Sequence, residues 1–286
     1  MEVLCACDKR YLPHAATMLY SLLEHNNVSR IHFLYSSITN EHLLKLKKMA
    51  KNLGGELITY ELIDEELSTL YVDNWGSEAT YYRITAARVL PTDLKKVLYL
   101  DSDIIVRRSL QEVWDTGLDG HALAAVEDGW RPPWLPSGAK YFNAGVLLIN
   151  LDYWRIHNIY EKVIAFVKNN PDKVEHWDQD ALNGVLVNCW LELPSIWNAQ
   201  KRSQLAQGPA IVHFIGESKP WHWANTHPLK HEYNKYRLKT PWRRYRLEKP
   251  PSLVDRLRAL SRRSARVMLP VKLRQGLRAM LRQAAR

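Results

Sequence analysis

The chain has 286 residues, of which 46% are hydrophobic and 24% are charged, and its formal net charge is +10. These proportions are typical of a soluble globular protein, and the length accommodates one large domain or two small ones. No segment approaches the ~20 consecutive apolar residues of a membrane-spanning helix, which argues against a helical membrane protein.

The start of the chain and its cysteines indicate a cytoplasmic location. Met1 leads directly into EVLCAC, without the basic region and apolar stretch of a secretory signal. Cys5, Cys7 and Cys189 form neither an even set nor a CxxC pair, which favours free thiols in a reducing compartment. We therefore expect a cytoplasmic protein.

The first hundred residues alternate between short apolar runs and amphipathic segments. The apolar runs predict strands over residues 2–8, 30–37, 56–63 and 95–101. The amphipathic segments predict helices over residues 13–26, 40–55 and 79–91. Asn40 is a suitable N-cap, and Gly54 and Pro91 are suitable helix ends. Because strands separated by helices pair in parallel, the sequence predicts an α/β fold with a Rossmann-like, mostly parallel twisted sheet and helices on both faces.

Further elements are predicted between residues 109 and 216. Ser109 and Glu112 have the spacing of a helix capping box. A helix is predicted over residues 156–169, and a later one opens at Asp180. Further apolar runs cover residues 121–128, 141–154 and 210–216.

The segment KVLYLDSDIIV, residues 96–106, is an apolar run interrupted by Asp101 and Asp103. A desolvated carboxylate is costly unless it is paired. Ligands of doubly wound sheets bind where strands end, and Asp8 and Asp101 both end predicted strands, so we expect them at one rim. Residues two apart on an extended segment project to the same side, so the two acids of DSD predict a divalent cation site. The alternative is an ordinary turn after a strand.

A second apolar strand, in IVHFIGESKPWHW, ends at His213. A histidine beside two carboxylates gives a mixed nitrogen and oxygen ligand set, which favours Mn²⁺ or a similar ion over Ca²⁺, with Mg²⁺ also possible. Gly216 would let the backbone approach a phosphate closely, and Lys219 would neutralise that phosphate. A structural histidine at a strand end is the alternative.

Four segments, in this order along the chain, resemble glycosyltransferase family 8: VLYLDSDIIV, YFNAGVLLIN, WDQDALNG and HFIGESKPWH. The resemblance covers about residues 1–223 and is greatest to bacterial lipopolysaccharide and lipooligosaccharide galactosyl- and glucosyltransferases. It implies a GT-A fold, a UDP-hexose donor, Mn²⁺ dependence and retention of anomeric configuration. It also implies that Asp101, Asp103 and His213 hold the metal that bridges the donor's diphosphate.

The resemblance assigns further residues to the donor site. Tyr11 would stack on the uracil, although a tyrosine that packs on the following helix is the alternative. Arg83 would touch the donor sugar, although a surface ion pair is the alternative. The implied nucleotide-binding residues are Ala6, Asp8, Tyr11, Ser102, Gly216 and Lys219. The implied donor-sugar contacts are Arg83, Asn143, Ala144 and Asp178, whereas Gly145 is interpreted as a packing residue.

The WDQD segment is expected to carry the reaction. The resemblance places Gln179 beneath the anomeric carbon and Asp180 close by. Because an amide is a poor nucleophile, we favour same-face substitution through an oxocarbenium-like ion pair, in which the leaving phosphate takes the acceptor's proton. Double displacement with Asp180 as the nucleophile is the alternative, and an N-cap is its structural alternative.

The charge of the chain is concentrated in its last part. Residues 252–286 contain ten basic residues and one acid. Leucines form apolar stripes between the arginines, a pattern typical of helices that lie on an anionic bilayer. We therefore divide the chain into a catalytic domain, residues 1–239, and a basic, aromatic membrane-association segment, residues 240–286. A solvated helix or nucleic-acid binding are the alternatives.

A cytoplasmic transferase at the inner leaflet suits a lipid-linked glycan acceptor. We expect acceptor contacts between WDQD and IVHFIG, and a sugar platform from His176, Trp177, Trp130 and Trp134. The rival functions are a self-glucosylating, glycogenin-like transferase and a basic nucleic-acid-binding protein. Charge confined to the tail and acids at strand ends favour the transferase, without a nucleic-acid partner.

Overall fold

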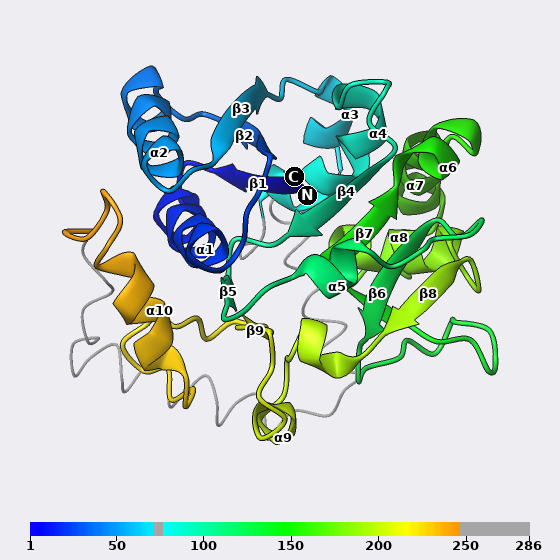
Figure 1. Cartoon of the computed structure of the whole chain (residues 1–286). Helices are drawn as coiled ribbons and strands as arrows, with labels where there is room; N and C mark the ends of the chain where they lie inside the picture. The colour runs from blue at the N-terminus through cyan, green and yellow to red at the C-terminus, as the bar shows by residue number, and fades with distance from the viewer. Residues whose placement is uncertain (71, 73–76, 246–286) are drawn as a thin grey trace, which may run out of the picture. The chain divides into compact units, whose positions relative to one another are not determined.

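The computed structural model describes residues 1–70, 72 and 77–245 (Figure 1). The larger of two compact units comprises Met1–Trp221 and Asn225–Tyr245, and the helices and strands below belong to it. The amphipathic helices predicted within residues 252–286 lie outside the described residues. No helix in the described part is long and apolar enough to cross a bilayer.

A seven-stranded sheet with the order β3-β2-β1-β4-β7-β6-β8 forms the centre of this unit. Its strands are β1 (Glu2–Asp8), β2 (Arg30–Ser36), β3 (Glu56–Glu61), β4 (Lys96–Leu100), β6 (Leu123–Glu127), β7 (Phe142–Asn150) and β8 (Trp190–Leu193). β7 runs antiparallel to its neighbours β4 and β6, and the other pairs are parallel. The predicted mostly parallel, Rossmann-like sheet is confirmed.

Helices cover both faces of the sheet, as Figure 1 shows. The alternation of β1 explains this, because Val3 and Cys5 belong to the buried cluster of α1 and α2, whereas Leu4 and Ala6 belong to that of α7 and α8. The helices are α1 (Leu12–His25), α2 (Asn40–Asn52), α3 (Glu65–Ser68), α4 (Ala86–Val89), α5 (Gln111–Trp114), α6 (Leu151–Ile156), α7 (Ile159–Asn169), α8 (Trp177–Val185), α9 (Arg202–Leu205) and α10 (Lys230–Arg237), with the 3₁₀ helices η1 (Glu78–Thr85) and η2 (Ser195–Trp197).

Two predicted helices are divided in the structure. The segment 79–91 forms the 3₁₀ helix η1 followed by the short helix α4, which ends before Pro91 as predicted. The segment 156–169 falls in α6 and α7, which are separated by Asn158 in the left-handed region with φ 50°. Because a left-handed residue cannot continue a right-handed helix, the chain turns there.

The predicted helix ends are partly correct. Gly54 follows α2 with φ +83°, a conformation that glycine adopts without strain, so the predicted end is confirmed. The predicted cap of α2 is wrong by one residue, because Thr39 is the N-cap and Asn40 is already helical. The predicted capping box is wrong, because α5 begins at Gln111 and Ser109 Oγ accepts a bond from the Gln111 N–H instead.

The last apolar strand does not join the central sheet. β9 (Ile211–His213) pairs antiparallel with β5 (Ile104–Val106), and Ile104 lies opposite His213. Because β5 follows Asp103 directly, this small sheet brings the histidine of one segment beside the acids of another. The two motifs that the sequence analysis selected are therefore neighbours in space.

Leu147→Ala should lower the free energy of unfolding by about 2–5 kcal/mol, because large-to-small changes in a core leave a cavity. Leu147 is completely buried in β7, in the cluster that includes α6, α7 and α8. Urea unfolding followed by circular dichroism measures the change. Leu44→Ala is the matched control, since Leu44 is 66% exposed. Equal losses in the two variants would contradict the central position of β7.

Candidate active site

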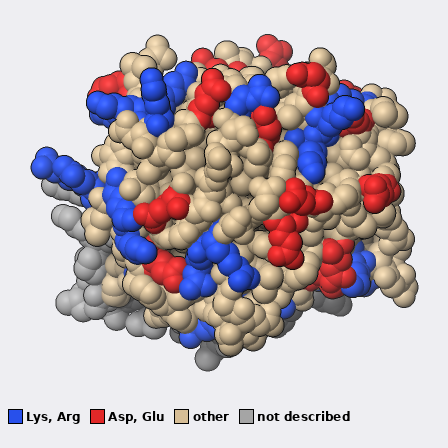
Figure 2. Space-filling view, viewed as in Figure 1, with Lys and Arg blue, Asp and Glu red and all other residues tan. Residues whose placement is uncertain are grey.

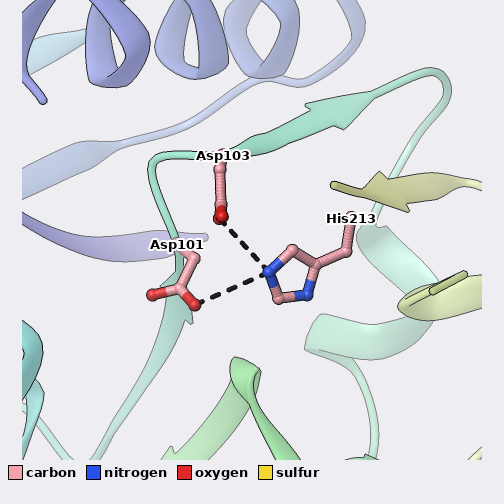
Figure 3. A group of neighbouring side chains, drawn as sticks. All are labelled: Asp101, Asp103 and His213. Atoms are coloured by element: carbon pink, nitrogen blue, oxygen red, sulfur yellow. Dashed lines mark ion pairs between the residues drawn. The ribbon is translucent and has the colours of Figure 1, made fainter. Parts of the chain in front are cut away.

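Asp101, Asp103 and His213 converge on one point (Figure 3). Nε2 of His213 lies 3.2 Å from Oδ1 of Asp103 and 3.8 Å from Oδ2 of Asp101. One ligand atom from each residue lies within 4.8 Å of the other two, so the three side chains can share an ion. The predicted proximity of these three residues is confirmed.

The chemistry of this set suits a divalent cation. Burial would raise the pKa of Asp103, but Lys219 and His213 outweigh this effect and hold the pKa well below its usual range. Asp103 is therefore an ionised carboxylate at neutral pH. Two carboxylates and an imidazole are a ligand set used for Mn²⁺ and related ions.

Gly145 in β7 leaves room for the side chains of His213 and Asp101. A Cβ atom at this position would lie 2.2 Å from Cε1 of His213 and 2.7 Å from Oδ2 of Asp101. Both distances are far below ordinary contact, so only glycine fits here without displacing a ligand. The sequence analysis interpreted Gly145 as a packing residue. The signal that the sequence analysis missed was the run Asn143, Ala144 and Gly145, which places a polar and two small residues at the start of a buried strand.

Arg83 joins two acids of the site from a buried position. Its Nε lies 2.8 Å from Oδ2 of Asp178, and Nη2 lies 3.2 Å from Oδ1 of Asp101. Nη1 donates to the backbone oxygen of Ala144. Because Arg83 is 6% exposed, the alternative of a surface ion pair is wrong.

The charges of this ion pair are set by burial and by each other. Burial alone would lower the pKa of Arg83, but Asp101 and Asp178 raise it, so the guanidinium stays charged. Burial raises the pKa of Asp178 to about 7, and Arg83 opposes this rise. Asp178 is therefore less fully ionised at neutral pH than Asp103, whose pKa is lowered.

Gln179 is fixed by the backbone of β7. Its Oε1 accepts from the N–H of Ala144 at 2.9 Å, and its Nε2 lies 3.4 Å from Oδ2 of Asp128. Asn143 donates to the same oxygen of Asp128 at 3.2 Å. Asp128 was not selected from the sequence, where the only signal was an acid directly after an apolar run.

Asp180, the residue after Gln179, is completely buried. Its Oδ1 accepts from the hydroxyl of Tyr141 at 2.7 Å. Its Oδ2 accepts from the N–H of Glu175 at 2.7 Å and from the N–H of His176. Since α8 begins at Trp177, these bonds tie the segment before the helix to its first turn. Both oxygens of Asp180 are therefore engaged within the protein.

The implied nucleotide residues lie around the same rim. Leu4 of β1 pairs with Tyr99 of β4 in parallel, so both strands end on the side where Asp8 and Asp101 lie. The expectation that these two acids share one rim is confirmed. Ser102 donates from Oγ to the backbone oxygen of Ala6 at 3.1 Å, which fastens the DSD turn to β1.

Asp8 and Tyr11 form a turn between β1 and α1. Oδ1 of Asp8 accepts from the N–H of Arg10 at 2.8 Å and from the N–H of Tyr11 at 3.1 Å. The Tyr11 ring lies edge-on to Trp221, with ring centroids 5.6 Å apart. Tyr11 thus contacts an aromatic ring from the segment that follows β9.

Gly216 and Lys219 follow β9. Gly216 has φ +80°, which explains the need for glycine, and no atom lies within 4 Å of where its Cβ would be. Nζ of Lys219 donates to Oδ2 of Asp103 and, at 2.9 Å, to the backbone oxygen of Phe214. The lysine is therefore anchored beside the cation site.

Comparisons with known proteins agree with this geometry. The sequence matches the model of glycosyl transferase family 8 over residues 2–225. It is 31% identical over 265 residues to General stress protein A of Bacillus subtilis, covering 82% of this chain and 92% of that protein. It is also 31% identical over 249 residues to a lipopolysaccharide 1,3-galactosyltransferase of Salmonella typhimurium, covering 78% and 73% of the two proteins.

The fold is also similar to solved structures. The galactosyltransferase LgtC, solved in complex with donor and acceptor sugar analogs, superimposes with a TM-score of 0.76 at 27% identity, covering 84% of this chain and 96% of that one. Other relatives are longer, and the chain covers only 32% of the glycosyltransferase GlyA of Streptococcus pneumoniae. The chain belongs to glycosyltransferase family 8 and is a glycosyltransferase with a GT-A-like fold. It therefore acts on a sugar donor and a glycan acceptor.

With Mn²⁺ as the probe ion for this candidate cation site, Gly145→Ala should weaken its binding by about tenfold or more, because the new methyl group displaces His213 and Asp101. Titration of the free Mn²⁺ signal in electron paramagnetic resonance measures the affinity. Gly117→Ala is the control, since its nearest neighbour is the flexible side chain of Asp119 at 3.2 Å. Unchanged affinity in Gly145→Ala would contradict the assignment of the ligands.

Proposed function

We propose that the protein is a retaining hexosyltransferase that moves glucose or galactose from a UDP-sugar to a lipopolysaccharide-type glycan acceptor, with Mn²⁺ as the cofactor. The observation that carries this proposal is the convergence of Asp101, Asp103 and His213 at the rim of a GT-A-like sheet. The similarity to a lipopolysaccharide 1,3-galactosyltransferase supports the choice of sugar and acceptor class.

The residues around the cation site would hold the nucleotide. Asp101, Asp103 and His213 would hold a divalent ion there, which would supply Lewis-acid chemistry that neutralises the charge of the leaving diphosphate. Lys219, anchored beside Asp103, adds a point charge on the same side. Asp8, Ala6 and Ser102 line the end of β1 where the nucleoside would lie, and Tyr11 offers an aromatic face for the base.

Gln179 and its neighbours would hold the donor sugar. The Ala144 N–H fixes the amide of Gln179, so its dipole is oriented before the substrate binds. The bond from the anomeric carbon to the phosphate oxygen breaks, and the acceptor hydroxyl forms its new bond on the same face. The departing phosphate oxygen takes the acceptor's proton, which keeps the charges balanced.

We assign Asp180 a positioning role within this mechanism. Both of its oxygens already accept hydrogen bonds, from Tyr141 and from two backbone N–H groups. A carboxylate with no oxygen directed at a substrate is unsuited to attack an anomeric carbon. Asp180 is therefore better suited to support Tyr141 and α8 than to form a covalent intermediate.

A groove beside Asp128 is suited to the acceptor. It has a volume of about 350 Å³ and is lined by residues that follow β6 and β8, including Trp130, Gln200 and Lys201. Amides, charged groups and an aromatic ring are the side chains that sugars contact in proteins. Gln200 and Lys201 fall within the segment where the sequence analysis expected acceptor contacts, and Trp130 was an expected platform residue.

UDP should raise the melting temperature of the protein when Mn²⁺ is present and much less when it is absent, because the ion links the nucleotide to the protein. Thermal scans with each component alone and with both together measure this. Incubation with UDP-glucose or UDP-galactose, followed by detection of released UDP, then identifies the donor.

Asp103→Asn is the matched variant for these experiments. It keeps the size of the side chain and removes its charge, so it should abolish both the Mn²⁺-dependent stabilisation and sugar release. A melting temperature near that of the wild type without metal shows that the variant is folded. Full turnover in this variant would contradict the metal assignment.

We further propose that residues 240–286 hold the enzyme at the cytoplasmic face of the inner membrane. The support is the sequence of this segment, with ten basic residues and leucine stripes within residues 252–286. Each basic residue near anionic lipid contributes about 1 kcal/mol to attachment. A lipid-linked acceptor would then be presented to the enzyme at the same surface.

Deletion of residues 252–286 should release the protein from anionic liposomes but leave donor hydrolysis unchanged, because the predicted donor site lies within residues 1–239. Co-sedimentation with phosphatidylglycerol vesicles measures attachment. A variant with serine at Leu253, Leu257 and Leu260 keeps every arginine and tests the apolar stripe separately. Unchanged sedimentation of the deleted protein would refute the membrane role of this segment.

The two rival functions have less support. On the face shown in Figure 2, basic side chains lie among acidic ones rather than in one basic patch, which does not favour a nucleic-acid surface. A self-glucosylating enzyme needs an acceptor tyrosine that reaches its own site. Tyr141, which lies beside Gln179, instead donates its hydroxyl to the buried Asp180.

A further inference from the structure

A buried chain of amide groups connects His213 to the backbone of β7. Nδ1 of His213 lies 2.9 Å from Oδ1 of Asn198, and Nδ2 of Asn198 donates to Oδ1 of Asn143 at 2.9 Å. The same oxygen of Asn143 accepts from the N–H of Gly145 at 3.0 Å. Asn198, which follows η2, is completely buried and has no role in the mechanism above.

The backbone N–H of Gly145, at one end of this series of hydrogen bonds, fixes the direction of every bond in the series. A backbone N–H can only donate, so Gly145 requires the oxygen of Asn143 to face it. The other end of the Asn143 amide faces the carboxylate of Asp128 at 3.2 Å, which requires the NH₂ group there. These two contacts independently give Asn143 the same orientation.

The orientation of Asn143 determines that of Asn198. Because the oxygen of Asn143 already accepts, Asn198 must present its NH₂ group to it. The oxygen of Asn198 therefore faces His213, where Nδ1 must carry a proton to complete the bond. In the neutral imidazole, Nε2 then carries the lone pair, and this nitrogen faces Asp101 and Asp103.

This form of the imidazole is the one that binds metal ions. A second hydrogen bond from the far ring nitrogen commonly fixes the tautomer of a metal-binding histidine. Here Nε2 lies 3.2 Å from a carboxylate oxygen of Asp103, so three lone-pair donors meet at one point. Such a meeting is unfavourable unless a positive charge lies there, either a proton on Nε2 that pairs with Asp103 or a metal ion that takes the place of that proton.

We propose that Asn198 is a positioning residue that holds His213 in the metal-binding tautomer and thereby sets the affinity of the site for a divalent cation. The proposal rests on the metal role of His213 in the proposed function. It assigns the effect to the side-chain oxygen of Asn198 and separates it from the bond to Asn143, which uses the opposite end of the amide.

Two variants of Asn198 separate these contributions. Asn198→Asp keeps an oxygen that accepts from Nδ1 of His213, whereas Asn198→Leu keeps the size and has no acceptor. Both lose the donor to Asn143, so loss of that bond alone predicts the same effect in both. We expect the Mn²⁺ dissociation constant of the aspartate variant within about threefold of the wild type, and that of the leucine variant raised about 10–100-fold.

The full chain is used, with free Mn²⁺ measured by electron paramagnetic resonance and with melting temperatures recorded with and without Mn²⁺. The Mn²⁺-dependent rise in melting temperature should persist in Asn198→Asp and shrink in Asn198→Leu. If the leucine variant does not fold, Asn198→Val makes the same comparison with a smaller apolar side chain.

Two results would overturn the proposal: wild-type affinity in the apolar variant, or a tenfold weaker affinity in folded Asn198→Asp. Asp101→Asn distinguishes this outcome from failure of the proposed function. If wild type binds Mn²⁺ no better than Asp101→Asn, the metal site itself is wrong. If wild type binds better than Asp101→Asn but the Asn198 variants do not differ, only the role of Asn198 is refuted.

Discussion

The site is arranged around carboxylates near the end of β4 that are largely shielded from water and therefore need positive partners. Asp101, Asp103 and Asp178 are all at least partly buried, and a buried carboxylate is costly without a cation beside it. Arg83 forms ion pairs with Asp178 and with one oxygen of Asp101, and Lys219 forms an ion pair with one oxygen of Asp103. The remaining oxygens of the two DSD acids converge with His213, and a cation at that point would offset the negative charge that Arg83 and Lys219 leave uncompensated.

The reversed strand β7 supplies the fixed partners of the site. Because β7 runs antiparallel to β4 and β6, its first residues lie at the rim where these two neighbouring strands end. There the N–H of Ala144 orients Gln179, and the N–H of Gly145 orients Asn143. A backbone N–H can neither rotate nor exchange donor for acceptor, so the two amides inherit one defined orientation. The same strand therefore organises the predicted sugar site and the cation site.

The sequence predicts those parts of the protein that have a local signature. Alternating apolar runs and amphipathic segments are sufficient for β1 to β4 and for α1 and α2, whereas β8 and α10 were not predicted. DSD and a strand-end histidine are sufficient to locate the candidate cation site. The segment 79–91 was misjudged because Tyr81–Thr85 are all buried, which leaves no single apolar face to reveal the helix type. The family resemblance selected Arg83, but its buried ion pairs with Asp101 and Asp178 depend on partners far away in sequence. Asp128 and Asn198 also depend on distant partners, and no local pattern distinguishes them from an ordinary strand-end acid or loop asparagine.

The order of the strands also bears on synthesis at the ribosome. β7 is inserted between β4 and β6, although both precede it in the chain, and His213 arrives later still on β9. A nascent chain that stops short of β9 lacks one of the three ligand groups, however well its N-terminal strands have formed. The three side chains can therefore share a cation only after β9 has been synthesised.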